Sequence, residues 1–223
     1  MIVMKFGGSS VESAVAIQRV AGIVRSRIDR HPIVVVSAMG KTTNRLLEIA
    51  GDAINGNRAD ALTKLGALRA FHLKEADGLG VNNEIDAHFE ELAELVRGLS
   101  VMGEMTPRAT DAVSAYGERL SSIVVAAAFR QAGMKALHVD SREYVVTDTR
   151  HTQAAPLFDK TNAKLASLPK SEVVVMGGFI ASTEEGVTST LGRGGSDYTA
   201  SIVGAGIGAD EIQIWTDVDG MLT

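Results

Sequence analysis

Five short apolar runs along the chain predict β-strands. Two of them, residues 33–36 and 172–176, are of the continuous kind that is typical of strands covered on both faces. The stretch 179–190, with the polar sequence Glu184-Glu185-Gly186 at its centre, predicts a β-hairpin. The five runs are residues 2–6, 33–36, 136–139, 172–176 and 212–215.

Helical spacing of apolar residues fills most of the chain between these strands. Apolar side chains repeat every three or four positions over residues 17–28, with charged residues away from that stripe. Residues 39–100 show no strand-like alternation, so we expect helices that cap one end of the sheet. One long helix is expected over residues 107–133, between a proline and a glycine. The other expected elements are a loop over 140–152 and helices over 156–168 and 197–203.

Strands that alternate with helices in this way predict an α/β fold with a mostly parallel central sheet sandwiched between helices. In such folds, ligands bind beyond the carboxyl ends of the strands. Glycines or polar residues follow most of the predicted strands, so we expect them to gather at one edge of the sheet. These residues are Lys5, Gly7, Gly8, Ser9, Ser37, Gly177, Gly178, Thr216 and Asp217.

Composition narrows the class of protein further. The 223 residues are 45% hydrophobic, enough for the core of one globular domain. A net charge of −5 without a basic run argues against nucleic-acid and membrane partners. The chain has no cysteine and its five histidines are scattered, so we expect neither disulfides nor a dedicated metal site. No apolar run is long enough to span a membrane, and we expect a cytoplasmic protein.

The stretch 190–198 is the strongest candidate for a binding site. It contains three glycines, Arg193, Ser196 and Asp197 directly before an apolar helical segment. Glycine lets the backbone approach a ligand closely, and a helix N-terminus capped by Ser196 would attract an anion. The stretch therefore predicts a cradle for a phosphate or carboxylate. The alternative is an ordinary glycine turn, which would not need the arginine.

Four further residues are candidates, each with an ordinary alternative. Lys5 ends an apolar strand before two glycines, as a phosphate ligand would, although it could be a surface lysine. Glu118 lies beside Gly117 and off the apolar stripe of its helix, so it is either a ligand-binding or a solvated carboxylate. Ser37 and Thr43 could be pocket residues. The ordinary alternative is that one of them is a cap and the other a loop hydroxyl.

Six segments, taken together and in this order, resemble the aspartokinases of the amino acid kinase superfamily. The full set distinguishes this resemblance from acetylglutamate, glutamate and uridylate kinases. The segments are Lys5-Phe6-Gly7-Gly8-Ser9-Ser10-Val11, Val36-Ser37-Ala38-Met39-Gly40 with Thr43-Asn44, Tyr116-Gly117-Glu118, Gly178-Phe179-Ile180, Thr190 through Tyr198, and Trp215-Thr216-Asp217-Val218-Asp219-Gly220.

The resemblance implies an aspartate kinase, which transfers the γ-phosphoryl group of ATP to the β-carboxylate of L-aspartate in the first step of lysine, threonine and methionine biosynthesis. A carboxylate is already ionised at neutral pH, so the reaction needs positioning and charge neutralisation rather than a general base. The resemblance also implies Mg²⁺ held mainly through the ATP phosphates.

The resemblance assigns a role to each candidate residue. Lys5 and Asp197 are the implied catalytic residues: the first stabilises the transferring group, and the second holds the lysines and the magnesium shell in place. Arg193 would grip the α-carboxylate of aspartate and Glu118 its α-ammonium group. The remaining pocket residues would be Ser37, Thr43, Phe179, Gly194 and Ser196. The nucleotide site would include Lys5, Gly7, Gly8, Ser9, Thr216 and Asp217.

Aspartokinases continue past these segments with the rest of the nucleotide site and commonly with ACT regulatory domains. Residues 1–223 are therefore expected to form the catalytic domain of a homo-oligomeric protein. Two alternatives remain open from the sequence. The chain could be a catalytically incomplete fragment that acts as an aspartate-binding or assembly module, or it could be another small-carboxylate kinase of the same fold.

Overall fold

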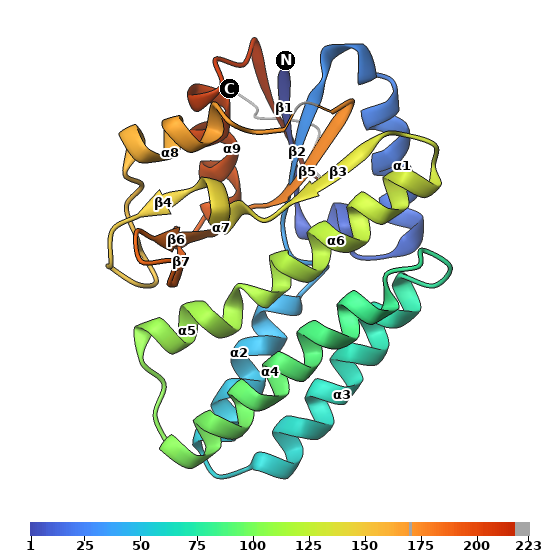
Figure 1. Cartoon of the computed structure of the whole chain (residues 1–223). Coiled ribbons are helices and arrows are strands. Elements are labelled where there is room, and N and C mark those ends of the chain that lie inside the picture. The colour runs from blue at the N-terminus through green and yellow to red at the C-terminus, as the bar shows by residue number, and fades with distance from the viewer. Residues whose placement is uncertain (170, 217–223) are drawn as a thin grey trace, which may run out of the picture.

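The computed structural model describes residues 1–169 and 171–216, and its central element is a parallel sheet of five strands in the order β3-β5-β2-β1-β8 (Figure 1). Every neighbouring pair in this sheet is parallel. The strands are β1 (Ile2–Phe6), β2 (Pro32–Val36), β3 (Ala136–Val139), β5 (Val173–Gly177) and β8 (Glu211–Trp215). The inner strands β2 and β5 are buried along their whole length, which confirms the interpretation of their continuous apolar sequences.

Helices cover both faces of this sheet, and alternate residues of the strands pack into two separate cores. In β1, the side chains of Ile2, Met4 and Phe6 join the core beneath α1 (Ala14–Arg25) and α6 (Tyr116–Gln131). Val3 joins the core beneath α9 (Gly195–Gly206). Because side chains alternate along a strand, Lys5 shares the face of Val3. The sandwich of helices around a mostly parallel sheet is confirmed.

A group of helices extends from one end of the sheet, as the sequence predicts for residues 39–100 (Figure 1). These helices are α2 (Thr42–Ile54), α3 (Arg58–Glu75) and α4 (Asn82–Met102). The single long helix expected over residues 107–133 is wrong, because the chain bends at Ala115 and forms α5 (Pro107–Ser114) and α6. The two halves pack on different sheets: α6 contacts β3 and β5, whereas α5 contacts β7 of a smaller sheet.

The smaller sheet has the order β4-β6-β7 and lies beside α5. Its strands are β4 (Val146–Thr147), β6 (Ile180–Thr183) and β7 (Thr188–Thr190). Strands β6 and β7 are antiparallel, which confirms the predicted hairpin. The loop expected over residues 140–152 is wrong in part, because it contains α7 (Ser141–Tyr144) and β4. Asp140 caps α7, and β4 forms by pairing with β6, a contact between distant segments that no local pattern reveals.

The remaining elements are short. Helix α8 (Phe158–Leu165) is shorter at both ends than the expected helix over 156–168. Two 3₁₀-helices, η1 (Gly8–Val11) and η2 (Ile28–Arg30), flank α1. Among the described residues, no helix is both long and apolar enough to cross a membrane.

Candidate functional site

A cavity of about 320 Å³ opens at the carboxyl edge of the central sheet and collects residues from six separate parts of the chain. All nine residues predicted from the sequence as catalytic or substrate-binding line this cavity. The lining residues are Lys5, Ser37, Thr43, Glu118, Phe179, Gly192, Arg193, Gly194, Gly195, Ser196 and Asp197. Of the residues expected to gather at one edge of the sheet, Lys5 and Ser37 line this cavity. The chemical roles of the lining residues stay predictions.

The two predicted catalytic residues both line the cavity and form an ion pair with each other. Lys5 Nζ lies 2.8 Å from Asp197 Oδ1. Strand alternation turns Lys5 toward the α9 face, where Asp197 stands in the first turn of that helix. A carboxylate is favourable there because the N-terminus of a helix carries partial positive charge. The lysine side chain is only 11% exposed and the aspartate side chain 53%, so the charges meet at the boundary between core and solvent.

Glu118 is a buried carboxyl group with an unused hydrogen-bonding atom. The residue is 4% exposed; Oε1 accepts from the backbone N–H of Ala38 at 3.1 Å, whereas Oε2 has no hydrogen-bond partner among the described residues. Burial raises the pKa of Glu118 to about 8, although the Ala38 N–H acts in the opposite direction. The alternative of a solvated helix carboxylate is therefore wrong. Glu118 lines the cavity, and a buried oxygen without a partner is suited to a donor from a ligand.

Arg193 belongs to a loop of glycines that also lines the cavity. It lies between Gly192 (φ 76°) and Gly194 (φ 74°), both in the left-handed region that favours glycine. The arginine is exposed, and no acceptor pairs with its guanidinium in the part of the chain that the structure describes. Its five N–H donors thus remain available to a planar anion.

Ser196 does not cap α9, contrary to the sequence-based prediction. The N-cap residue is Gly194, and no side chain caps the helix there. The left-handed conformation of Gly194 reverses the chain early, so the helix already begins at Gly195 and Ser196 lies inside its first turn. Ser196 instead packs against Gly178, where a Cβ atom would lie 2.7 Å from Ser196 Cβ. Gly178 therefore allows the N-terminus of α9 to approach the end of β5.

Unlike the catalytic and substrate-binding residues, most of the residues predicted to bind nucleotide do not line the Lys5 cavity. A Cβ atom on Gly8 would lie 2.9 Å from the carbonyl oxygens of Ala38 and Gly40, and the Gly40 N–H donates to the Gly8 carbonyl at 3.0 Å. The loops after β1 and β2 are thereby held together. Gly7 lies beside the Lys5 ammonium.

The remaining predicted nucleotide residues, Ser9 and Thr216, line a separate cavity of about 260 Å³ next to Trp215, so the structure does not bring them to the Lys5 cavity. Asp217 lies outside the described residues.

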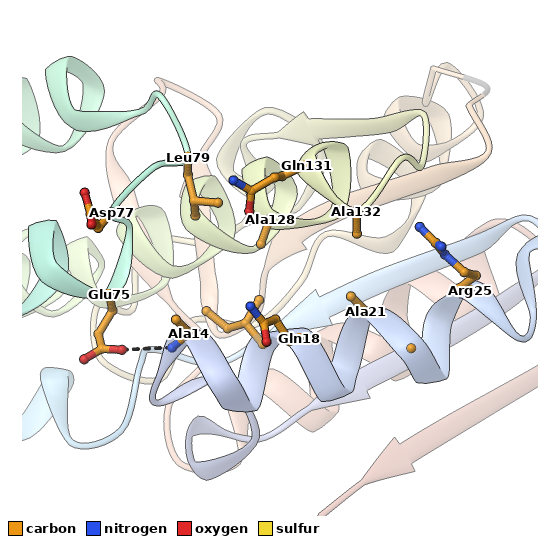
Figure 2. Close-up of a pocket in the computed structure, with 12 residues that line it drawn as sticks. Ala14, Gln18, Ala21, Arg25, Glu75, Asp77, Leu79, Ala128, Gln131 and Ala132 are labelled. Atoms are coloured by element: carbon orange, nitrogen blue, oxygen red, sulfur yellow. Dashed lines mark hydrogen bonds between the residues drawn. The ribbon is translucent and has the colours of Figure 1, made fainter.

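A larger cavity of about 390 Å³ lies elsewhere, between α1, α6 and the turn after α3 (Figure 2). Alanines form much of its wall, and Figure 2 shows Arg25 at one end and Glu75 with Asp77 at the other. Glu75 Oε2 accepts from the backbone N–H of Ala14 at 2.9 Å, which satisfies a free donor at the start of α1. None of the residues predicted to be functional lines this cavity, so we place the site at the smaller one.

The described residues contain no group of three or more histidine, cysteine, aspartate or glutamate side chains placed to hold a metal ion.

Two lining residues, Gly192 and Gly195, were not predicted as site residues, although they belong to the stretch 190–198. A Cβ atom on Gly195 would lie 2.8 Å from Phe179 Cδ2. The signal that could have found it is the pair Gly194-Gly195 directly before a helix.

The arrangement of strand ends, glycine loops and charged side chains agrees with comparisons to known proteins. A model of the amino acid kinase family matches residues 1–223. The chain belongs to the amino acid kinase family. It is 39% identical over 99% of its length to aspartokinase 2, chloroplastic, of Arabidopsis thaliana, and covers 42% of that protein. It is 33% identical over 100% of its length to lysine-sensitive aspartokinase 3 of Escherichia coli K12, and covers 50% of that protein.

Two solved structures that are similar to this member of the amino acid kinase family are also aspartokinases. The structure of E. coli aspartokinase III in complex with aspartate and ADP gives a TM-score of 0.88 at 31% identity, over 99% of this chain and 50% of that one. The structure of Clostridium acetobutylicum aspartate kinase gives a TM-score of 0.80 at 26% identity, over 100% of this chain and 49% of that one. The amino acid kinase fold is therefore shown. The chain spans about half the length, or less, of the relatives it matches.

Proposed function

We propose that residues 1–223 form the catalytic domain of an aspartate kinase. The reaction transfers the γ-phosphoryl group of ATP to the β-carboxylate of L-aspartate and gives 4-phospho-L-aspartate, the first step of lysine, threonine and methionine biosynthesis. Aspartokinases from a plant and a bacterium are similar to the whole chain. The solved relatives include one with lysine and aspartate bound and one with aspartate and ADP bound.

The observation that carries this proposal is the pair of unused polar groups in the Lys5 cavity. Glu118 Oε2 is buried without a partner, and the Arg193 guanidinium is unpaired among the described residues. An α-amino acid offers both complements at once: its ammonium group suits Glu118, and its carboxylate suits the planar fork of Arg193. Ser37, Thr43 and Phe179 complete the wall around such a ligand.

Lys5 stands where a second, side-chain carboxylate would meet a phosphoryl group. Both reactants are anions, so the attack requires a cation between them rather than a base, and the acceptor carboxylate loses no proton. The ion pair with Asp197 holds the Lys5 ammonium in place before the substrates arrive. In this mechanism the γ-phosphorus–oxygen bond to ADP breaks as the bond to the carboxylate oxygen forms.

ATP is proposed to place its phosphates beside Lys5 and the loop of Gly7, Gly8 and Ser9. Gly7 supports that position because it lies beside the Lys5 ammonium, whereas Ser9 lines the separate cavity next to Trp215. Mg²⁺ bound to the phosphates would neutralise part of their charge. Asp197, which is half exposed, would orient its shell. Thr216 and Asp217 are proposed to belong to the nucleotide site of the whole protein.

The whole protein is further proposed to be a cytoplasmic homo-oligomer. The plant relatives carry the word chloroplastic in their names, so fractionation of the source cells is the direct test of location. Light scattering of the purified protein tests the oligomeric state.

A test of the proposed reaction is acyl phosphate formation by the full-length protein with Mg-ATP and L-aspartate, trapped as the hydroxamate. We expect product only when aspartate is present. Glutamate, N-acetylglutamate and carbamate serve as competing acceptors, and faster reaction with any of them would replace aspartate kinase by another kinase of this fold. Calorimetric binding of aspartate with no trapped product would instead indicate a binding module.

A further inference from the structure

We propose that Asp111 is a positioning residue for substrate binding: it holds the loop that carries Arg193 in the orientation needed to grip the substrate carboxylate. This inference rests on the proposed function for its substrate, although the anchoring of the loop can be measured separately. Asp111 lies on α5 and does not line the cavity. Its link to the predicted site is Thr190, the first residue of the stretch 190–198.

Asp111 is completely buried and accepts hydrogen bonds from two segments at once, the loop after β4 and the end of β7, where the Arg193 loop starts. Its side chain is 0% exposed. Oδ1 accepts from Thr190 Oγ1 at 2.5 Å, and both carboxylate oxygens lie 3.0 Å from the backbone N–H of Thr152. Oδ2 also lies 2.8 Å from His151 Nδ1. A buried carboxylate is costly unless it is paired and hydrogen-bonded, so these donors determine where it can lie.

The two segments that Asp111 joins also contact each other directly. The Ala154 N–H donates to the Thr190 carbonyl at 2.9 Å. A Cβ atom on Gly192 would lie 3.0 Å from the Thr152 carbonyl oxygen, so the absence of a side chain lets the two segments approach closely at this point. Thr190 is the last residue of β7, and Arg193 follows it by three positions. The anchored point is therefore directly before the arginine.

The conformation of Thr152 indicates that the anchor constrains the backbone. Its φ is 71°, in the left-handed region that a β-branched residue rarely adopts. Such a conformation persists when surrounding contacts determine it, and they often do so near functional sites. Here the contact is the hydrogen bond from the Thr152 N–H to both oxygens of Asp111.

Two backbone hydrogen bonds shape the loop, from the Leu191 N–H to the Phe179 carbonyl and from the Gly195 N–H to the Gly192 carbonyl, both at 2.9 Å, and the Asp111 anchor adds the contact that fixes where the loop starts. Gly192 and Gly194 flank Arg193 with positive φ, and glycine has the widest backbone freedom. The guanidinium has no partner in the residues that the structure describes, so no side-chain contact orients it before the ligand binds. A fork that must meet a carboxylate in one plane loses affinity when its backbone is free to move.

The test compares Thr190→Val, which removes the hydroxyl donor to Asp111, with Thr190→Ser, which keeps it. Thr161→Val is the matched control, because the Thr161 hydroxyl is likewise buried and hydrogen-bonded, but it lies on α8 and its partner is the backbone of Val146. In the full-length protein we expect Thr190→Val to raise the KM for aspartate about tenfold with little change in kcat or in the KM for ATP. Asp111→Asn should give a larger effect in the same direction.

Trypsin cleavage after Arg193 reports on the loop without any assay of activity. Because Arg193 is exposed, its cleavage rate depends on how far the loop opens. We expect faster cleavage there in Thr190→Val and Asp111→Asn, an unchanged rate in Thr161→Val, and an unchanged rate after the distant Lys74 in all variants.

The outcomes separate the two proposals. If Thr190→Val matches Thr161→Val in both KM and cleavage, Asp111 only stabilises the fold and the inference is overturned. If the wild-type protein shows no aspartate-dependent turnover, the proposed function fails and the substrate role of Asp111 falls with it. The cleavage rates then still show whether Asp111 holds the loop. Recovery of both readouts in Thr190→Ser would support the inference.

Discussion

Lys5 Nζ lies 2.8 Å from Asp197 Oδ1, so the end of β1 is joined to the first turn of α9 by opposite charges. We expect Lys5→Ala and Asp197→Ala each to lower kcat by at least about 100-fold, because the cation at the reacting carboxylate is lost or misplaced. Hydroxamate formation and thermal unfolding should be measured together. The ion pair Arg69–Asp86 has the same length and lies on the outer helices, so Arg69→Ala should leave kcat unchanged. Full activity of either site variant would refute the assigned roles.

The pKa of Glu118 makes aspartate binding depend on pH. Burial raises this pKa to about 8, so the carboxyl group is mostly protonated at neutral pH in the free protein. An ammonium ligand needs the ionised form, so aspartate should bind more tightly as the pH rises toward 8, by up to about tenfold per pH unit. Calorimetry in two buffers of different ionisation enthalpy should detect release of a proton on binding. A dissociation constant that does not change with pH would contradict an ammonium contact at Glu118.

The same carboxyl group should lower the stability of the free protein at alkaline pH. The pKa is raised from 4.5 in the unfolded chain to about 8 in the folded one, so the folded state holds a proton that the unfolded state releases between these values. The stabilising contribution is present below the lower value and is lost as the pH rises through the upper one. We therefore expect Glu118→Gln to raise the free energy of unfolding at pH 8 by about 4 kcal/mol. The same variant should bind aspartate more weakly.

Urea unfolding of wild type and Glu118→Gln at several pH values tests whether the difference in their free energies of unfolding grows as the pH rises. The two proteins should differ least near pH 4.5 and most near pH 8. A difference that grows toward acid pH would mean that the buried carboxyl group is stabilised in its ionised form.

Arg193→Lys should raise the KM for aspartate by about tenfold or more while kcat changes less. A lysine keeps the charge but replaces a planar fork by a point charge, so bidentate recognition of a carboxylate is lost. Arg150→Lys is a suitable control, because Arg150 is exposed and pairs with Asp148 outside the cavity. Steady-state kinetics with each substrate varied in turn would show whether the KM for aspartate changes more than kcat. An unchanged aspartate KM would place the substrate carboxylate elsewhere.

Gly178→Ala should disturb the site, because the new Cβ would lie 2.7 Å from Ser196 Cβ and 2.8 Å from Ser196 Cα. Backbone atoms cannot move aside cheaply, so α9 must shift and carry Asp197 away from Lys5. We expect a loss of both activity and thermal stability. The control is Gly66→Ala in the interior of α3, where a Cβ meets no atom within 4 Å. Alanine there should stabilise the protein by up to about 1 kcal/mol. Retained activity in Gly178→Ala would show that α9 tolerates the shift.

Local sequence patterns determined the main layers of the fold. Strands β2 and β5 are apolar at nearly every position because they are covered on both faces, and this signal needs no knowledge of their partners. Some site residues could be predicted from position alone, because Lys5 and Ser37 lie at strand ends or belong, like Arg193, to motifs next to them, and the topology of a parallel sheet brings strand ends together. Thr43 and Glu118 lie on α2 and α6, and only the family resemblance assigned them to the site.

Only the tertiary structure decided the features that depend on distant neighbours. The bend at Ala115 arises because α5 and α6 pack on different sheets, and β4 exists because it pairs with β6. Burial of Glu118 could not be predicted from its place off the apolar stripe, because the chain after β2 covers it. Asp111 gave no signal, because its donors come from loops far along the sequence. Periodicity reports which face of an element is buried, whereas the partner of a buried polar group is determined by the packing of the whole chain.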